Sequence, residues 1–388
     1  MGRIIIFTGK GGVGKTTTAA AHAVKAAKEG MRTLIVSTDM AHNLSDLFMK
    51  EIKEEPAEIF DNLFALEIDS NYEMNRHYGS ISEAFKNMIS FKNAKDEEIM
   101  EDIVVFPGIE ELFSLLKIQE LYNQNIYDLI IVDCAPTGET LSLLKFPELF
   151  SWYMEKLFPI GKVAMKVLRP ISKVAFKLDM PNENAMNDIE KLYIKLGMLQ
   201  SLLKDREICS IRLVTIPEKM VLEESKRSYM YLNLYNFNVD GLYINRIMPA
   251  DIDNSFFDQW KQIQKKYLDE IHSIFSNIPI YKIKWYEVDI NGVSGLERVM
   301  EDSLQDANLF KVLKTTVNET FAKTENGYRL DVYIPFTNKK DFEIFESGTD
   351  IIVKIGNFKR NIPIPNVIRK YSIASAKLNE EVLSIYFE

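Results

Sequence analysis

The feature that most constrains the fold of this 388-residue chain is a glycine-rich loop close to its N-terminus. The strand-forming run Ile4–Phe7 leads into Gly9-Lys10-Gly11-Gly12-Val13-Gly14-Lys15-Thr16-Thr17, and an alanine-rich helical segment follows. This arrangement satisfies G-x-x-x-x-G-K-[ST] in the strand–loop–helix context that the pattern requires. Glycines let backbone N–H groups surround phosphate oxygens, and a helix N-terminus adds a favourable dipole. The loop therefore predicts a nucleoside triphosphate site.

The charged and hydroxyl side chains of this loop have distinct predicted tasks. Lys15 is expected to reach the β- and γ-phosphates, and the Thr16 hydroxyl to hold Mg²⁺. Lys10 directly follows the first glycine, which makes this the deviant form of the loop. The predicted ligands are accordingly ATP and Mg²⁺.

Composition limits the classes of protein that fit. A formal net charge of −9 disfavours a general nucleic-acid binder, because such a protein needs a basic face. Two cysteines do not make a disulfide framework, and no apolar run approaches the roughly 18 residues of a membrane-spanning helix. Ile4–Phe7 is too short to be the apolar core of a signal peptide. We therefore expect a cytoplasmic protein.

Residues 1–305 alternate between strand-like and helix-like segments, which predicts an α/β fold with a doubly wound, mainly parallel sheet. Asp39 follows one buried strand run, and Asp133 ends another and precedes a turn, as in a Walker-B element. Polar residues at the carboxyl ends of parallel strands line the ligand site in open α/β sheets. The predicted strands are Arg32–Ser37, Leu63–Ile68, Tyr127–Asp133, Ser210–Thr215, Gly241–Arg246 and Ile278–Ile283.

Two further regions differ from this pattern. Residues 146–204 interleave methionine, aromatic and lysine residues, and prolines divide them into short helices, which predicts a helical insert. Residues 306–326 are expected to be a linker or terminal helix. Residues 327–388 are predicted to form a small all-β sandwich. Its expected strands are Tyr328–Pro335, Ile351–Ile355, Phe358–Pro363, Ser372–Leu378 and Val382–Phe387.

Three motifs together resemble the arsenite-pump ATPase (ArsA) family, which includes the factors that target tail-anchored membrane proteins. They are the phosphate loop, Ser37-Thr38-Asp39-Met40-Ala41-His42-Asn43-Leu44-Ser45-Asp46, and Asp133-Cys134-Ala135-Pro136-Thr137-Gly138. The resemblance covers most of residues 1–305. Residues 327–388 are similar to the α-crystallin-type, small-heat-shock-protein-like domain that many bacterial members carry.

This resemblance implies roles for individual residues. Lys15 and the amides from Gly11 to Thr17 would bind phosphates, while Thr16 and Asp133 would hold Mg²⁺, the latter through water. Asp39 would orient or activate the attacking water, and Lys10 would reach the partner's nucleotide in a closed homodimer. Asn245 matches the family's adenine-binding asparagine, whose amide both donates and accepts hydrogen bonds.

Departures from the family pattern bear on the partner and the substrate. The chain has no C-x-x-C, so the zinc site that joins some related dimers cannot form, and two cysteines do not supply an arsenite-binding triad. The insert is either an ordinary helical subdomain or a groove for an apolar helix, and its basic surface suits an anionic membrane as a further alternative. For the β-domain, assembly, client contact and stabilisation remain open.

The leading hypothesis is therefore a dimeric Mg-ATP-hydrolysing chaperone or targeting ATPase that binds a hydrophobic helix or membrane-protein client. The alternative is an ATPase subunit that energises an efflux pump for arsenite or another anion at the membrane. An iron–sulfur reductase would need two cysteines per chain facing a dimer axis, and Cys134 and Cys209 lie in unsuitable contexts. A partitioning ATPase would leave the two extra regions unexplained.

Overall fold

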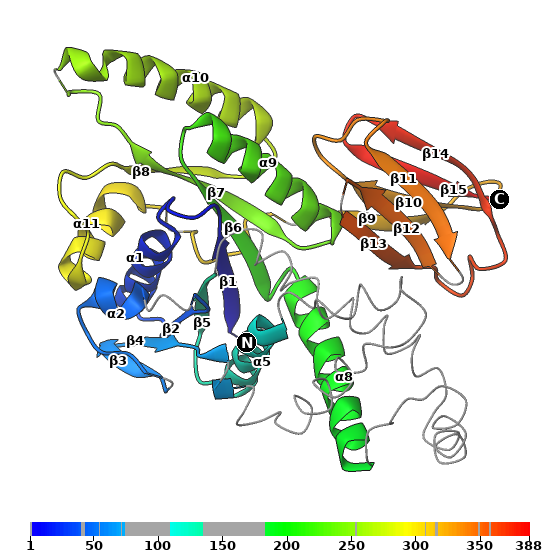
Figure 1. Ribbon diagram of the computed structural model, residues 1–388, viewed down its shortest axis with the longest axis horizontal. Helices are drawn as coiled ribbons and strands as arrows, with labels where there is room; N and C mark the ends of the chain where they lie inside the picture. The colour runs from blue at the N-terminus through cyan, green and yellow to red at the C-terminus, as the bar shows by residue number, and fades with distance from the viewer. Residues whose placement is uncertain are drawn as a thin grey trace, which may run out of the picture. The chain divides into compact units, whose positions relative to one another are not determined.

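The computed structural model describes most of the chain, and Figure 1 shows its arrangement. The described residues are 2–39, 43–53, 55–70, 72–73, 109–134, 183–252, 254–306, 308–314, 317–347, 350–356 and 358–388. The chain divides into two compact units. The first comprises Met1–Ile4 and Ala26–Leu203, and the second comprises Ile5–Lys25 and Lys204–Glu388.

Eight strands form a mainly parallel sheet in the order β3-β4-β2-β5-β1-β6-β7-β8. Strand β2 pairs in parallel with β4 and β5, β7 pairs in parallel with β6 and β8, and β3 runs antiparallel to β4. The predicted α/β fold is thus confirmed. The strands are β1 (Arg3–Thr8), β2 (Thr33–Ser37), β3 (Ala57–Phe60), β4 (Leu63–Glu67), β5 (Leu129–Asp133), β6 (Cys209–Thr215), β7 (Val239–Ile247) and β8 (Ile280–Lys284).

The helices of this region follow the expected alternation with strands. Among the described residues, no helix combines the length and apolar composition that crossing a bilayer requires. The helices are α1 (Lys15–Lys28), α2 (Asn43–Phe48), α5 (Ile109–Asn123), α8 (Glu183–Lys204), α9 (Lys219–Leu234), the 3₁₀ turn η1 (Ser255–Phe257), α10 (Asp258–Ile274) and α11 (Gly292–Ser303).

In the first unit, helix α8 is the described part of the predicted insert, whereas residues 146–182 lie outside the described residues. Its apolar residues recur every three or four positions, and the stripe Leu192, Leu196, Leu199 and Leu203 is buried. Ile194 and Met198 stand on another face and are 53% and 60% exposed. The helix therefore has one packed side and one exposed apolar patch.

The second unit contains the C-terminal β-domain, in which β10 pairs antiparallel with β9 and β15, β12 with β11 and β13, and β14 with β15. One sheet has the order β14-β15-β10-β9 and the other β11-β12-β13, so the predicted all-β domain is confirmed. Strand β9 falls inside the predicted linker 306–326. The strands are β9 (Glu319–Lys323), β10 (Tyr328–Tyr333), β11 (Phe342–Ser347), β12 (Asp350–Ile355), β13 (Phe358–Pro363), β14 (Ile373–Asn379) and β15 (Val382–Phe387).

Within this unit, the β-domain packs against the C-terminal end of α9, as Figure 1 shows. The buried Arg360 of β13 donates to the carbonyl of Leu234, the last residue of α9, and pairs with Glu319 of β9. A cation at a helix C-terminus satisfies a free carbonyl and complements the helix dipole. The Tyr231 and Phe358 ring centroids lie 3.5 Å apart. The β-domain is thus docked by both charge and aromatic contact.

Candidate functional site

The phosphate loop joins β1 to α1 within the second unit, as the sequence predicts. Lys15 is the first residue of α1 and is only 7% exposed. Gly9 and Val13 are buried, Gly11 and Gly12 are exposed, and Lys10, Gly14, Thr16 and Thr17 are half-buried. The Thr18 hydroxyl donates to the Gly14 carbonyl over 2.8 Å, which ties the loop to the first helical turn.

Two glycines of the loop adopt backbone angles that favour glycine, and they differ in what surrounds them. Gly14 has φ +89°, and a Cβ atom there would lie 2.2 Å from Asn245 Nδ2. Gly12 has φ +79°, and a Cβ atom there would meet nothing within 4 Å. Side chains rarely adopt such φ values. The loop is therefore open beside the exposed Gly12 and closed by a side chain behind Gly14.

That closing side chain is Asn245, near the carboxyl end of β7. Its Nδ2 donates to the Val13 carbonyl over 2.9 Å, and its Oδ1 accepts from the Arg246 backbone N–H over 2.8 Å. An asparagine amide offers two donor hydrogens and two acceptor lone pairs. These two bonds therefore leave one donor and one acceptor position for another group. The structure brings Asn245 into contact with the phosphate loop itself, which the sequence does not predict.

Lys10 extends from the loop toward α9 of the same chain. Its Nζ lies 3.9 Å from Glu224 Oε2, and the two side chains are 37% and 26% exposed. An ion pair of this length and exposure contributes little to stability. The lysine is therefore held weakly and is available for another anion.

The predicted carboxylates lie in the first unit, at the carboxyl ends of neighbouring strands. Asp133 is the last residue of β5, is 1% exposed, and pairs in register with Ser37 of β2. The Thr38 N–H donates to the Asp133 carbonyl over 3.1 Å, and the Asp39 N–H donates to Ser37 Oγ over 3.2 Å. Asp39 and Asp133 thus lie at the carboxyl edge of the sheet, because β2 and β5 run parallel and end side by side.

Glu67, which the sequence analysis does not single out, accepts three hydrogen bonds at the start of α2. Its Oε1 accepts from the N–H groups of Leu44 and Ser45 over 2.9 and 3.0 Å, and its Oε2 accepts from Ser45 Oγ over 2.9 Å. A carboxylate at a helix N-terminus satisfies free N–H groups. The only sequence signal was an acid at the end of a buried strand run.

Several predicted features lie outside the described residues. They are Met40–His42, the turn Ala135–Gly138, and residues 146–182 of the insert. Among the described residues, the phosphate loop with Asn245 and Glu224 belongs to the second unit, and Asp39, Asp133 and Glu67 belong to the first. Oxygen ligands of the kind that Thr16 and Asp133 supply are those that Mg²⁺ prefers, so the donor set fits this ion.

Comparison with known families matches nearly the whole chain. A family model described as "Anion-transporting ATPase" matches residues 2–305. A second, described as "HSP20-like domain found in ArsA", matches residues 325–387. The first match contains the phosphate loop, both carboxylates and Asn245, and the second contains most of the β-domain.

Individual relatives fall into two groups by length. "Putative arsenical pump-driving ATPase 1" of Aquifex aeolicus is 32% identical, over 99% of each chain. "Putative arsenical pump-driving ATPase" of Chlorobaculum tepidum is 34% identical, over all of this chain and 96% of its own. "ATPase ASNA1 homolog 1" of Paramecium tetraurelia is 31% identical, over 76% of this chain and 91% of its own. Relatives in this last group align with about three quarters of the chain.

Proposed function

Because this chain belongs to the anion-transporting ATPase (ArsA) family and is an ATPase, we propose that it is a Mg-ATP-dependent homodimer that couples its nucleotide state to binding of a hydrophobic client. The observation that carries the nucleotide part is the phosphate loop, with open space beside Gly12 and the buried Lys15 at the start of α1. Such a loop presents backbone N–H groups and a helix N-terminus to an anion. We further propose that the homodimer acts in the cytoplasm.

Within the site, we assign phosphate binding to Lys15 and the loop amides from Gly11 to Thr17. The Thr16 hydroxyl and the Asp133 carboxylate would hold Mg²⁺, which when bound neutralises charge on the β- and γ-phosphates. Phosphoryl transfer depends mainly on positioning and on neutralising charge. Residues of these types therefore suffice for hydrolysis, provided that a group positions the attacking water.

We assign that positioning to Asp39, and substitution tests it. Asp39→Asn should keep ADP affinity within about twofold and lower kcat by roughly 100-fold or more, because an amide cannot accept the proton of water. Calorimetry and a phosphate-release assay give the two values. Unchanged kcat would remove Asp39 from this role.

We propose that the Lys10 side chain gives up its ion pair with Glu224 and contacts the nucleotide bound by the partner copy. Mixing two inactive variants tests this. In a heterodimer of Lys10→Ala and Asp39→Asn chains, one site keeps both an intact Asp39 and an intact Lys10 if the lysine acts in trans. Both sites are defective if it acts in cis. Mixing should therefore restore up to half of the activity per heterodimer, and no restoration would contradict the assignment.

For the client, we propose an apolar helix that contacts the insert, including the exposed patch of Ile194 and Met198 on α8. An exposed apolar patch that contains methionine suits varied apolar partners. With ATP and Mg²⁺, the protein should retain a fluorescent hydrophobic helix, and Met198→Asp should weaken retention at least fivefold. Met220→Asp is the matched control, since Met220 is 69% exposed on α9 and lies outside the insert. Equal retention by the wild type and both variants would contradict this contact.

A second candidate function is supported by the full-length relatives whose names read "arsenical pump-driving ATPase". In that case the chain would energise an anion pump at a membrane. Arsenite or antimonite should then stimulate the ATPase rate of the purified protein. A rate that stays constant over a wide range of either anion would exclude this candidate.

A further inference from the structure

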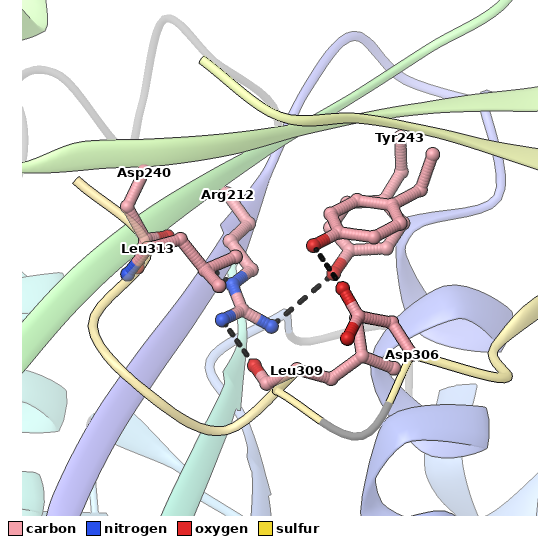
Figure 2. A network of polar contacts seen from close by, with 7 residues as sticks. Arg212, Asp240, Tyr243, Asp306, Leu309 and Leu313 are labelled. Atoms are coloured by element: carbon pink, nitrogen blue, oxygen red, sulfur yellow. Dashed lines mark hydrogen bonds and ion pairs between the residues drawn. The ribbon is translucent and has the colours of Figure 1, made fainter.

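The segment between the ATPase region and the β-domain is anchored by a buried ion pair. We call residues 306 and 308–314 the clasp segment. Arg212 of β6 and Asp240 of β7 are both fully buried, and Arg212 Nε lies 3.2 Å from Asp240 Oδ1. Figure 2 shows the guanidinium between Asp240, the Tyr243 hydroxyl and the Leu309 carbonyl. A buried charge of this kind is stable only when its partners remain in place.

The same ion pair holds the clasp segment at two points. Arg212 Nη2 donates to the carbonyl of Leu309, and the N–H of Leu313 donates to Asp240 Oδ2 over 3.4 Å. A third bond runs from the Tyr281 hydroxyl to Asp306 Oδ2 over 3.1 Å. The Leu309 side chain is completely buried. The clasp segment is therefore anchored by the buried Leu309 side chain and by these hydrogen bonds, although Asp306, Asn308 and Lys311 are exposed.

Helix α1 contacts this network through His22. The His22 Nδ1 atom lies 2.7 Å from the Thr18 carbonyl, and the Thr18 hydroxyl donates to the Gly14 carbonyl of the phosphate loop. The His22 ring packs edge-on against Tyr243, with centroids 4.7 Å apart, and against Phe310 of the clasp segment, at 6.5 Å. A continuous chain of contacts therefore joins the phosphate loop to the clasp segment.

Beyond the clasp segment, contacts continue into the β-domain. Lys314 Nζ lies over the rings of Tyr229 in α9 and Tyr333 in β10, 5.7 and 5.3 Å from their centroids. Asn318 Nδ2 donates to the Phe237 carbonyl over 2.9 Å. Together with Arg360 on the end of α9, these contacts join the β-domain to α9 and to Phe237, two residues before β7.

We propose that the clasp segment makes the docked β-domain and the phosphate-loop half of the ATPase one cooperative unit, so that nucleotide in the loop stabilises the docking of the β-domain. The coupling is reciprocal, because two sites linked by one equilibrium affect each other by the same factor. Weakening the clasp segment therefore also lowers nucleotide affinity, although it touches no nucleotide.

Hydrogen exchange of the full-length protein, measured with and without ADP, tests the proposal. The proposal rests on the proposed function in one respect: ADP must bind the phosphate loop. In the wild type, ADP at about 100 times its Kd should slow amide exchange by up to about 100-fold in α1, the clasp segment and β13. The three regions respond together because they unfold in a single cooperative opening that releases ADP. In Arg212→Gln, α1 should keep most of the slowing of exchange by ADP, whereas the clasp segment and β13 should lose it. The amides of the clasp segment and β13 would then exchange through an opening that does not release ADP.

Arg329→Gln is the matched control, because it removes an arginine from a half-exposed ion pair with Asp331 inside the β-domain. It should retain the wild-type response in all three regions. If Arg212→Gln does not fold, Tyr281→Phe gives the same test, since it removes only the hydroxyl bond to Asp306 and should at least halve the response of the clasp segment. Slower exchange in wild-type α1 without any change in the clasp segment and β13 would overturn the proposal. No change in α1 itself would instead contradict nucleotide binding.

Discussion

At the scale of single residues, Asn245 makes contacts that the sequence does not predict. Its amide holds the Val13 carbonyl and the Arg246 N–H, so it positions the phosphate loop as well as standing where an adenine-binding residue is expected. These two roles differ in the ligand that they affect. A residue that contacts only the base has no effect on a ligand without one.

Asn245→Ala should therefore weaken binding of tripolyphosphate, which has no base, by roughly fivefold, the equivalent of about 1 kcal/mol for one lost hydrogen bond. Titration calorimetry with tripolyphosphate and with ATP measures both effects. Asn254→Ala is the control, because Asn254 caps η1 and lies outside the loop. If Asn245→Ala binds tripolyphosphate as tightly as the wild type but binds ATP more weakly, Asn245 contacts the base and does not position the phosphate loop.

His22 predicts how acid affects stability. Burial, followed by the positive charge of Arg212, lowers the pKa of His22 from 6.5 to about 3. Because the folded pKa lies below the unfolded one, the stabilising contribution is complete above pH 6.5 and is lost progressively as the pH falls toward 3. The free energy of unfolding should fall by up to about 1.4 kcal/mol per pH unit in this window from His22 alone.

His22→Phe keeps an aromatic ring against Phe7 and Tyr243 but cannot take up a proton. Between pH 7 and pH 5, its free energy of unfolding should therefore fall by about 2 kcal/mol less than that of the wild type. Urea titrations at both pH values provide the comparison. Parallel losses in the two proteins would show that His22 does not titrate on unfolding.

At the scale of elements, the sequence predicts the strands that lie inside each sheet, whereas it predicts only some of the edge strands, β8, β13 and β14. The long apolar runs of β1, β2, β5 and β6 predict strands because every position is buried or nearly so. The missed strands β3, β9 and β11 each stand at the end of a sheet. An edge strand buries little surface, so its pairing depends on a neighbour distant in sequence rather than on its own pattern.

Distance along the chain also decides which site residues can be predicted from the sequence. The loop residues from Gly9 to Thr17 are contiguous, so one motif predicts their arrangement. The partners of Arg212 lie 28, 31 and 97 residues away, and no local pattern indicates them. Glu67 lies 22 and 23 residues from the N–H groups of α2 that it accepts. Their roles follow only from the fold.

Helix α2 supplies a prediction at this scale, because Glu67 accepts three hydrogen bonds at its start. In Glu67→Gln, an amide group replaces one of the carboxylate oxygens and cannot accept from a donor. The free energy of unfolding should fall by about 2 kcal/mol, because the start of α2 loses a hydrogen-bond acceptor, while ADP affinity stays unchanged. Glu58→Gln, an exposed position on β3, is the control. An equal effect of the two substitutions would contradict an anchoring role.

At the scale of the whole molecule, charge predicts how the proposed dimer responds to salt. Each copy has a formal net charge of −9, so two copies repel each other at long range. Raising ionic strength shortens the Debye length from about 30 Å at 0.01 M to about 8 Å at 0.15 M. Association of two copies should therefore tighten over this range.

Sedimentation velocity with a non-hydrolysable ATP analogue at both ionic strengths measures the dimer dissociation constant. We expect it to fall by at least threefold as salt rises. Weaker association at higher salt would show that attractive charge pairs at the interface outweigh the repulsion between net charges. The Lys10 side chain, released from Glu224, would be the first candidate for such a pair.

The neutral ring of His22 also provides a spectroscopic label that requires no chemical modification. A carbonyl only accepts hydrogen bonds, so the contact with Thr18 requires that Nδ1 carries the proton. Burial protects this proton from exchange with water, and the chain has only four histidines. In ¹⁵N-histidine-labelled protein, a single slowly exchanging ring resonance should therefore report directly on α1, and titration with ADP should move it.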